Sequence, residues 1–315
     1  DEDTGGQVVY VVELAKAFSR LPDIEGVDLF TRQIIDKRYP HYSKEVEYLT
    51  EKARIVRIPC GGNAYIKKTK LWPFIDEYVE NVLAFNAKDG VLPNIIHANY
   101  ADAGLAGVKL AEKTGASLVF TAHSLGKPKI EKLGVNGKNY AKFDEEYHFT
   151  QRLAAEQEAI DRANAIIAST SDEIKGQYRG YRLNRNKVHA IPPGVDLAKF
   201  YPAAKIRETG AYLLKAVNTG LADPKKPAIL AVSRLDRGKN LPGLVRAFCN
   251  SAQLPKIANL VVLTGLKKNA GGEQKKIFEE LIGILSETGN SENVSLVKFI
   301  DAREGLGDLY RMVAP

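Results

Sequence analysis

The chain has 315 residues, and at a typical domain size of about 150 residues this length predicts two domains. Lys and Arg total 45 against 38 Asp and Glu, but the net charge of +7 is scattered along the chain, which argues against nucleic acid and indicates phosphate-containing ligands. The two cysteines lie far apart, no apolar run approaches the roughly 18 residues of a membrane span, and no signal sequence is visible, so we expect a cytoplasmic protein without disulfides, a cysteine metal site or a membrane partner.

The first predicted element is a helix that follows two glycines. Gly5, Gly6 and Gln7 stand directly before 8–18, a segment whose apolar residues fall on one helical face. Glycine lets a ligand approach the main chain closely, and the free N–H groups and positive dipole end of a helix start favour phosphate. We therefore predict an anion site here, with a plain loop before a core helix as the alternative.

The chain begins inside this glycine loop, and its only methionine is Met312. We interpret the sequence as a fragment. We expect the strand that leads into Gly5 to lie upstream, so that the first domain lacks its first strand.

Further along, short runs rich in β-branched residues alternate with helical segments, the longest predicted helix running from about 143 to 164. The predicted strands are Gly26–Arg32, Ala53–Pro59, Asn94–Ala98, Ser117–Ala122, Ala165–Ala168 and Val188–Ile191. This alternation predicts an α/β fold with a parallel, doubly wound sheet. Lys67, Lys68 and Lys70 follow the carboxyl end of the second strand, where open α/β sheets bind ligands.

The alternation of predicted strands and helices stops at Pro192–Asp196, and a less regular, charged stretch follows. We therefore place the domain boundary there and expect domains of 1–205 and 206–315. Strands are then predicted at Ala228–Val232, Asn259–Leu263 and Val294–Ile300, with a helix from about 273 to 288 and another beginning at Leu306. Because three strands are few for such a domain, we expect the second domain to be incomplete in this chain.

Four segments together resemble the sucrose-phosphate synthase family. They are DTGGQVVYVVELAKAF at the start, HANYADAG, TAHSLGKPKIEKL, and IPPGVD followed by SRLDRGKN. The resemblance runs in order over nearly the whole chain. It implies a retaining glycosyltransferase of the GT-B fold, in which two Rossmann-like domains face a cleft and take fructose 6-phosphate and a nucleotide sugar respectively.

The resemblance also implies roles for individual residues of the first domain. Lys129 and Arg152 are the expected phosphate-binding pair, which agrees with the two-point grip of arginine on phosphate and the point charge of lysine. Positions matching the acceptor site of the family are Gly6, Gln7, Lys68, Tyr100, Ser124, Lys129 and Arg152.

On the donor side, Gly6 matches a glycine that also touches the donor phosphate in the family. Arg234 and Lys239 match the pair that binds the donor diphosphate and offsets the charge growing on the leaving group. His123 matches the active-site histidine that contacts the transferred sugar. The resemblance thus implies catalytic roles for His123, Arg234 and Lys239.

Two departures from the family pattern bear on function. Asn99 stands where the family usually shows a histidine, and NYADAG is in this respect closer to sucrose synthase, which uses free fructose. The family's EPFG segment, which holds the nucleotide ribose and the sugar, has no counterpart before Pro315. We therefore do not expect this chain by itself to be active.

We predict an enzyme that moves glucose from a nucleotide-diphosphate glucose, UDP-glucose first among the candidates, to fructose 6-phosphate. The sequence shows no metal-ligand cluster, so we expect no metal or other cofactor in the chemical step. A sucrose-phosphate phosphatase is the expected pathway partner. The alternatives are a sucrose synthase, a mannosyl-transferring relative and a catalytically silent sugar-phosphate-binding protein. Preference for UDP or ADP, oligomeric state and regulation are not indicated.

Overall fold

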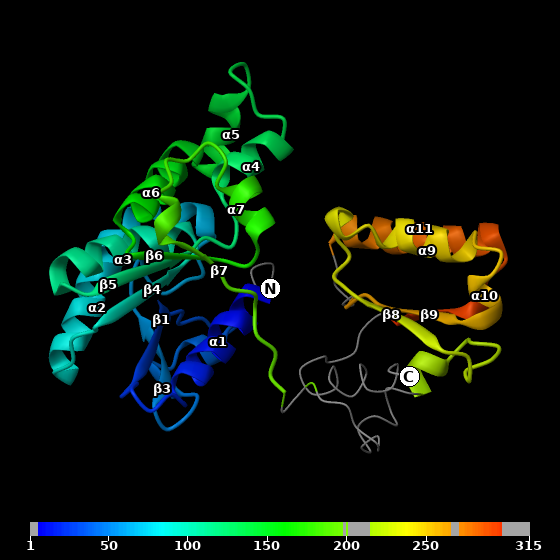
Figure 1. Ribbon diagram of the computed structural model, residues 1–315, viewed down its shortest axis with the longest axis horizontal. Helices are drawn as coiled ribbons and strands as arrows, with labels where there is room; N and C mark the ends of the chain where they lie inside the picture. Colours follow the sequence, from blue (N-terminus) through cyan, green and yellow to red (C-terminus); the bar gives the residue numbers. More distant parts are fainter. Residues whose placement is uncertain (1–5, 198–199, 201–214, 266–270, 298–315) are drawn as a thin grey trace. The chain divides into compact units, whose positions relative to one another are not determined.

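The computed structural model describes residues 6–197, 200, 215–265 and 271–297. The chain divides into two compact units, residues 1–194 and 195–315, and each is described by itself (Figure 1). The boundary predicted at 205 lies in 201–214, outside the described residues.

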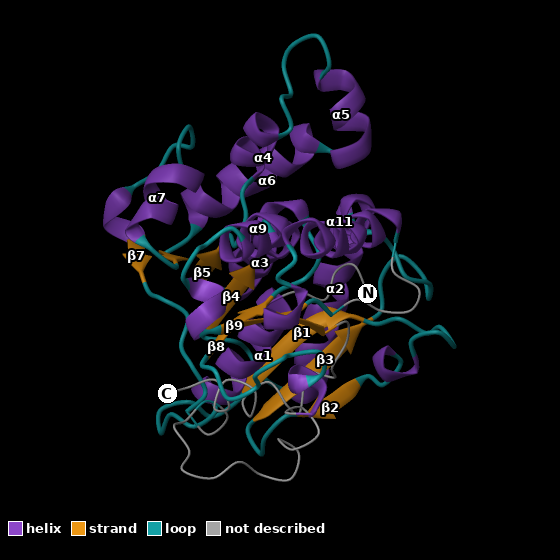
Figure 2. Cartoon of the chain, turned by 90° about the vertical axis from the view of Figure 1, so that its right-hand side faces the viewer, coloured by secondary structure: helices purple, strands orange, loops and turns teal. Residues whose placement is uncertain are grey.

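Unit 1 contains a small three-stranded sheet with the order β1-β3-β2 (Figure 2). Its strands are β1 (Val27–Arg32), β2 (Val46–Tyr48) and β3 (Ala53–Ile58). β1 and β3 are parallel, as predicted, whereas β2 pairs antiparallel with β3. β2 was not predicted, because three residues give too short an alternation to stand out from a loop.

The second sheet of unit 1 is parallel throughout and has the order β4-β5-β6-β7. Its strands are β4 (Ile95–Asn99), β5 (Ser117–Thr121), β6 (Ala165–Ala168) and β7 (Val188–Ala190). Because consecutive strands are neighbours and such crossovers are right-handed, the connecting helices α3 (Ala101–Thr114), α6 (Phe149–Arg162) and α7 (Ser171–Gln177) cover the same face. The predicted α/β fold with parallel sheets is confirmed.

Helix α3 packs unusually close to this sheet. A Cβ atom on Gly107 would lie 2.9 Å from Ala98 Cβ and 3.0 Å from Leu118 Cδ1, so only glycine allows this approach. Phe120 of β5 and Ala159 of α6 are fully buried in the same core. This packing fixes where β4 and β5 end relative to the helices that follow them.

The helix predicted from 143 to 164 is two helices. α5 (Tyr140–Tyr147) ends and α6 (Phe149–Arg162) begins at His148, whose φ of 51° lies in the left-handed region. The prediction of one continuous helix was wrong because apolar periodicity continues on both sides of a break that a single backbone angle produces. Histidine adopts the left-handed region more readily than most other non-glycine residues, but its presence alone does not predict a break in a helix.

The remaining helices of unit 1 frame the first sheet. α1 (Gly6–Phe18) lies beside β1, and within this fully described helix Ala15 alone is buried, while Val8 is 48% exposed. α2 (Ile75–Asp89) contributes Val79 and Val82 to the core over β3 and ends at Gly90 in the left-handed conformation. Shorter helical pieces of unit 1 are η1 (Pro40–Tyr42), η2 (Lys68–Lys70), η3 (Trp72–Phe74), α4 (Gly126–Lys132) and η4 (Arg185–Lys187).

Unit 2 is built on a parallel sheet of order β10-β9-β8. Its strands are β8 (Ala228–Val232), β9 (Asn259–Leu263) and β10 (Val294–Val297), and its helical pieces are η5 (Arg237–Lys239), α9 (Leu241–Cys249), α10 (Leu254–Ile257), α11 (Gly272–Thr288) and η6 (Ser291–Asn293). Every residue of β9 is buried, as expected of a central strand. The predicted end of β10 at Ile300 and the helix from Leu306 lie outside the described residues.

Within the described ranges, no helix is long and apolar enough to cross a membrane. The same residues contain no group of three or more His, Cys, Asp or Glu side chains that could hold a metal ion. Cys60 and Cys249 are both buried and unpaired.

Candidate active site

The candidate site of unit 1 is built where β4 and β5 end. The two strands pair in register, with Asn99 opposite Thr121, and the Tyr100 N–H donates to the Thr121 carbonyl at 2.9 Å. The residues that follow both strands are therefore at the same edge of the sheet. This is the edge where open parallel sheets bind ligands.

A pocket at this edge gathers residues from five separate segments, and we call it the basic pocket. Four of its members, Lys68, Tyr100, Lys129 and Arg152, are acceptor positions predicted from the sequence. The lining residues are Lys68, Thr69, Trp72, Tyr100, Asp102, Lys129, Tyr147 and Arg152.

Aromatic rings separate the cations of the basic pocket. The Arg152 Cζ atom lies 5.0 Å and the Lys68 Nζ atom 6.0 Å from the centroid of the Tyr100 ring. Lys129 Nζ lies 4.2 Å from the centroid of Tyr147. Such contacts attract a cation to the ring face and hold it in position without cancelling its charge.

The backbone of Tyr100 is strained. Its φ of 85° and ψ of 171° fall in a region that glycine occupies almost exclusively and that costs other residues about 1–3 kcal/mol. Strain of this kind persists only where the surrounding structure enforces it. At Tyr100 it turns the chain from β4 into α3 and places the ring between Lys68 and Arg152.

The Arg152 guanidinium lines the pocket and also donates hydrogen bonds to two groups of the protein. Its Nε donates to Glu156 Oε1 at 2.8 Å, one turn further along α6, and a terminal nitrogen donates to the Ser124 carbonyl at 3.0 Å. Ser124 therefore belongs to this cluster through its backbone, and its side chain is exposed. The guanidinium is fixed in plane and orientation before any ligand arrives.

Sequence reasoning missed Glu156, which organises the back of the pocket. Its carboxylate is fully buried and accepts hydrogen bonds from Arg152 Nε, the Gly126 N–H and the Tyr181 hydroxyl. Gly126 begins α4, so one carboxylate joins the helix that carries Lys129 to the helix that carries Arg152. The available signal was the spacing of four residues from Arg152, which places both side chains on one helical face.

The charges of the basic pocket act on one another. The pKa of Lys129 is lowered, first by burial and then by the positive charges of Arg152 and Lys68. Burial raises the pKa of the Asp102 carboxyl, an effect that its hydrogen bonds and the nearby Lys68 and Arg152 oppose. The pocket therefore brings three cations close enough together for the charges of Arg152 and Lys68 to act on Lys129.

His123 follows β5 in a tight turn. Its φ is 55°, and the Ser124 N–H donates to the Ala122 carbonyl at 2.6 Å across it. Its Nε2 is 2.9 Å from Asn99 Oδ1, and its ring meets the Tyr10 ring edge-on at a centroid distance of 5.4 Å. Burial lowers the pKa of His123, against the smaller opposite effect of Glu173, and so favours the neutral ring.

The predicted residues at the start of α1 lie one turn before this contact. Gly6 begins α1 and is exposed, Gln7 follows it, and Tyr10 is the residue that touches His123. The structure thus brings the first turns of α1 to the His123 turn. No hydrogen bond joins Gly6 or Gln7 to the basic pocket among the described residues.

The two predicted residues of unit 2 lie in the turn 233–240, after β8. Arg234 and Lys239 are both exposed, and neither forms an ion pair with a described residue. Between them Leu235 is buried in the core, and Asp236 accepts the Gly238 N–H at 2.7 Å. Asn240 ends the turn with a φ of 50°. A fixed turn with two uncompensated cations suits a diphosphate.

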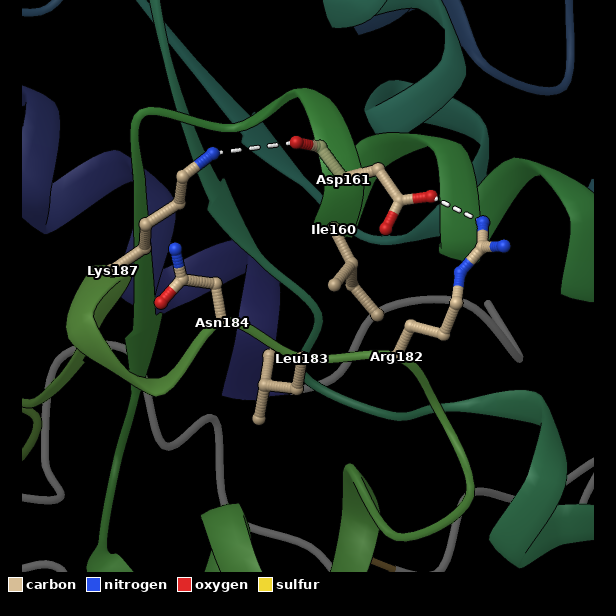
Figure 3. A pocket seen from close by; sticks show the side chains of 6 residues that line it. All are labelled: Ile160, Asp161, Arg182, Leu183, Asn184 and Lys187. Carbon is tan, nitrogen blue, oxygen red and sulfur yellow. Dashed lines mark hydrogen bonds and ion pairs between the residues drawn. The ribbon is translucent and has the colours of Figure 1, made fainter.

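A larger cavity, of about 530 Å³, lies elsewhere on unit 1 (Figure 3). Its cations are engaged by the protein: Arg182 pairs with Asp161 at 2.7 Å, and Lys187 Nζ donates to the carbonyls of Asp161 and Ala163. Because both of its cations are hydrogen-bonded within the protein, this cavity offers little to an anionic substrate.

Comparison with known proteins places these features in a family. Residues 1–195 match the model described as the sucrose synthase first GT-B domain. A probable sucrose-phosphate synthase of Thermosipho melanesiensis is 35% identical over 286 residues, which cover 88% of this chain and 62% of that protein. The chain spans about a third of the length of several plant sucrose-phosphate synthases, 30% in rice and 34% in Vicia faba.

Solved structures agree with this match. The sucrose-phosphate synthase of Thermosynechococcus elongatus aligns with a TM-score of 0.67 and 26% identity, over 98% of this chain and 68% of that one. Anabaena HepE in complex with UDP-glucose aligns with a TM-score of 0.58 over 98% of this chain and 69% of that one, and at 14% identity it shares the fold alone. The fold predicted from the sequence, GT-B, is thereby confirmed.

Proposed function

This chain belongs to the sucrose synthase and sucrose-phosphate synthase group of GT-B glycosyltransferases, and on that basis we propose that it transfers glucose from a nucleoside-diphosphate glucose to fructose 6-phosphate. The product is sucrose 6-phosphate. UDP-glucose is the donor that we favour. The basic pocket of unit 1 takes the acceptor, and the turn 233–240 of unit 2 takes the donor diphosphate.

The observation that carries the acceptor assignment is the convergence of Lys68, Lys129 and Arg152 on the basic pocket. Burial, and after it the positive charges of Arg152 and Lys68, lower the pKa of Lys129 and disfavour its ionised form. A phosphate group offsets these effects, because Lys129 then gains an opposite charge and charge-assisted hydrogen bonds. Free fructose offers no such compensation, so the pocket supports a phosphorylated acceptor.

The residue types that line the pocket suit the rest of the acceptor. Trp72 and Tyr100 supply apolar ring surface beside the cations, and Asp102 supplies a carboxylate that can accept hydrogen bonds from sugar hydroxyls. These residue types therefore support the sugar-phosphate assignment.

The proposed reaction retains the configuration at the anomeric carbon. The bond from that carbon to the donor diphosphate breaks, and a bond to the acceptor hydroxyl oxygen forms on the same face. The hydroxyl proton passes to an oxygen of the leaving phosphate. Arg234 and Lys239 stabilise the charge that develops on the diphosphate, which is where preorganised cations lower a barrier most. His123 contacts the transferred glucose.

Of the alternatives, a sucrose synthase that uses free fructose has one observation in its favour, Asn99 at the end of β4. The cations of the basic pocket argue for the phosphorylated acceptor instead. We also propose a cytoplasmic location, supported by two cysteines that are buried and unpaired. A phosphatase that acts on the product remains a prediction.

The test is an activity screen of the longer protein that contains this chain, with fructose 6-phosphate and fructose as acceptors and UDP-glucose, ADP-glucose and GDP-mannose as donors. We expect sucrose 6-phosphate from UDP-glucose and fructose 6-phosphate. Transfer to fructose at equal efficiency would favour a sucrose synthase, and product from GDP-mannose would favour the mannosyl-transferring relative. Binding of fructose 6-phosphate without transfer from any donor would identify a silent binding protein.

A further inference from the structure

A line of hydrogen bonds crosses the ends of β4 and β5 beside the proposed site of transfer. Asn99 Oδ1 lies 2.9 Å from His123 Nε2, and Asn99 Nδ2 donates to the His97 carbonyl at 3.2 Å. His97 Nε2 in turn lies 2.8 Å from Thr121 Oγ1. Asn99 therefore bridges a backbone acceptor on its own strand and an imidazole on the next.

The backbone carbonyl decides which way the Asn99 amide faces. A carbonyl oxygen only accepts hydrogen bonds, so it must meet the NH₂ group of Asn99 and not its oxygen. The oxygen then faces His123. An amide oxygen also only accepts, so the His123 nitrogen opposite it must carry a proton.

This geometry selects one form of the neutral ring. With the proton on Nε2, the other nitrogen, Nδ1, holds a lone pair and is an acceptor. Among the described residues Nδ1 has no hydrogen-bond partner. We propose that Asn99 is a positioning residue that keeps neutral His123 protonated on Nε2, so that Nδ1 accepts a hydrogen bond from a hydroxyl of the transferred hexose. The second half of this proposal rests on the proposed function.

The groups around His123 are compatible with a neutral ring. Among the residues that the structure describes, the titratable neighbours are His97 on β4, Tyr10 on α1 and Glu173 on α7. Burial lowers the pKa of His123 and outweighs Glu173, whose charge acts in the opposite direction. An amide at position 99 keeps its hydrogen-bonding pattern at every pH, since it does not titrate.

The direct test is nitrogen NMR of the chain labelled with ¹⁵N-histidine. The chain has five histidines, so replacing each in turn by glutamine assigns the signals. We expect His123 Nε2 to show the shift of a protonated nitrogen and Nδ1 that of an unprotonated one at pH 7. A proton on Nδ1 at that pH would overturn the proposal, whatever the reaction turns out to be.

An Asn99→Asp variant tests the same point by charge. Its carboxylate still accepts from Nε2 but favours the doubly protonated ring, so we expect the pKa of His123 to rise by about one to three units. In the longer protein we expect turnover at pH 7 to fall about two- to tenfold and to recover at a pH above the new pKa. A loss of turnover that is equal at every pH would mean that Asn99 is merely structural.

Asn81→Ala is the matched control, because the Asn81 amide donates to the Pro59 carbonyl in the same unit. It should leave the His123 signals and turnover unchanged. If the longer protein transfers no sugar while the NMR result stands, the proposed function fails and the role of Asn99 in fixing His123 does not. An unchanged pKa of His123 in a folded Asn99→Asp variant would contradict that role.

Discussion

The Nε of Arg152 donates to the carboxylate of Glu156 at 2.8 Å, and the two side chains are 6% and 0% exposed. A pair with this spacing on a helix surface contributes a few tenths of a kcal/mol. Here both charges are withdrawn from water, so removal of one leaves the other buried and uncompensated. The pair therefore contributes to the fold of unit 1 as well as to the orientation of Arg152.

We predict that Glu156→Ala destabilises unit 1 by about 3–5 kcal/mol, since Arg152, Gly126 and Tyr181 all lose their acceptor. Urea unfolding measures the change. The matched control is Glu158→Ala, an exposed carboxylate on the same helix, which should shift the midpoint little. Equal losses of unfolding free energy in the two variants would show that the hydrogen bonds of Glu156 stabilise the fold no more than an exposed carboxylate does.

Lys129→Ala tests phosphate binding without this complication. It removes one charge-assisted contact, worth about 1.5–3 kcal/mol, so we expect the KM for fructose 6-phosphate to rise roughly ten- to a hundredfold and the KM for the nucleotide sugar to stay unchanged. Arg152→Ala should raise the same KM, but it also leaves the buried Glu156 without its ion-pair partner. It is therefore a less specific test of phosphate binding. Steady-state kinetics of the longer protein measure both effects.

The control for Lys129 is Lys132→Ala, an exposed lysine on the same helix α4. It should leave acceptor saturation as in the wild type. If acceptor saturation is unchanged in Lys129→Ala as well, the acceptor phosphate binds elsewhere.

On the donor side, Arg234→Ala and Lys239→Ala should each lower turnover as well as donor affinity. Loss of one contact to a developing anion typically costs about 10²- to 10³-fold in rate. Arg237→Ala is the control, since Arg237 lies in the same turn but pairs with Glu280 at 2.6 Å. Steady-state kinetics at varied concentrations of the nucleotide sugar measure turnover and donor KM. A change confined to acceptor affinity would show that this turn does not bind the donor.

His97 predicts a dependence of stability on pH. Burial, with a smaller contribution from His123, lowers its pKa from 6.5 to about 4. Between these values the unfolded chain binds a proton that the folded chain does not, so stability falls as the pH drops from 6.5 towards 4. At about 1.4 kcal/mol per unit, the loss over that window is on the order of 3 kcal/mol.

Unfolding measured at pH 7 and pH 4.5 in wild type and His97→Gln tests this expectation. The variant should lose less stability on acidification than the wild type. His189→Gln replaces an exposed histidine of β7 and should behave as the wild type does. An identical acid response in wild type and His97→Gln would mean that other groups cause it.

The sequence predicted the strands more reliably than the connections between them. Runs such as 117–122 and 165–168 are short, β-branched and bounded by turn residues, so their pattern has one simple interpretation. The break at His148 and the strand at Val46–Tyr48 depend on a single backbone angle or on pairing with a distant strand, which local periodicity does not report.

For the site, residue types and resemblance together placed Lys68, Tyr100, Lys129 and Arg152, which the structure brings to one pocket. Glu156 could not be found in the same way, because a glutamate four residues from an arginine is usually an exposed helix pair. Its importance depends on burial, which only the packing of α4, α6 and Tyr181 establishes. The amide orientation of Asn99 depends likewise on a carbonyl two residues away.

The backbone angles of Tyr100 make this position a marker for comparing related sequences. Glycine adopts these angles without strain, but it would also remove a ring that packs against the buried Trp72, Ala101 and Ala155. Stability therefore does not by itself favour the exchange, and selection for the ring between Lys68 and Arg152 opposes it further. A relative with glycine at the equivalent position has therefore lost both this packing and the ring of the pocket, and a relative that keeps an aromatic residue there retains both at the cost of the strain.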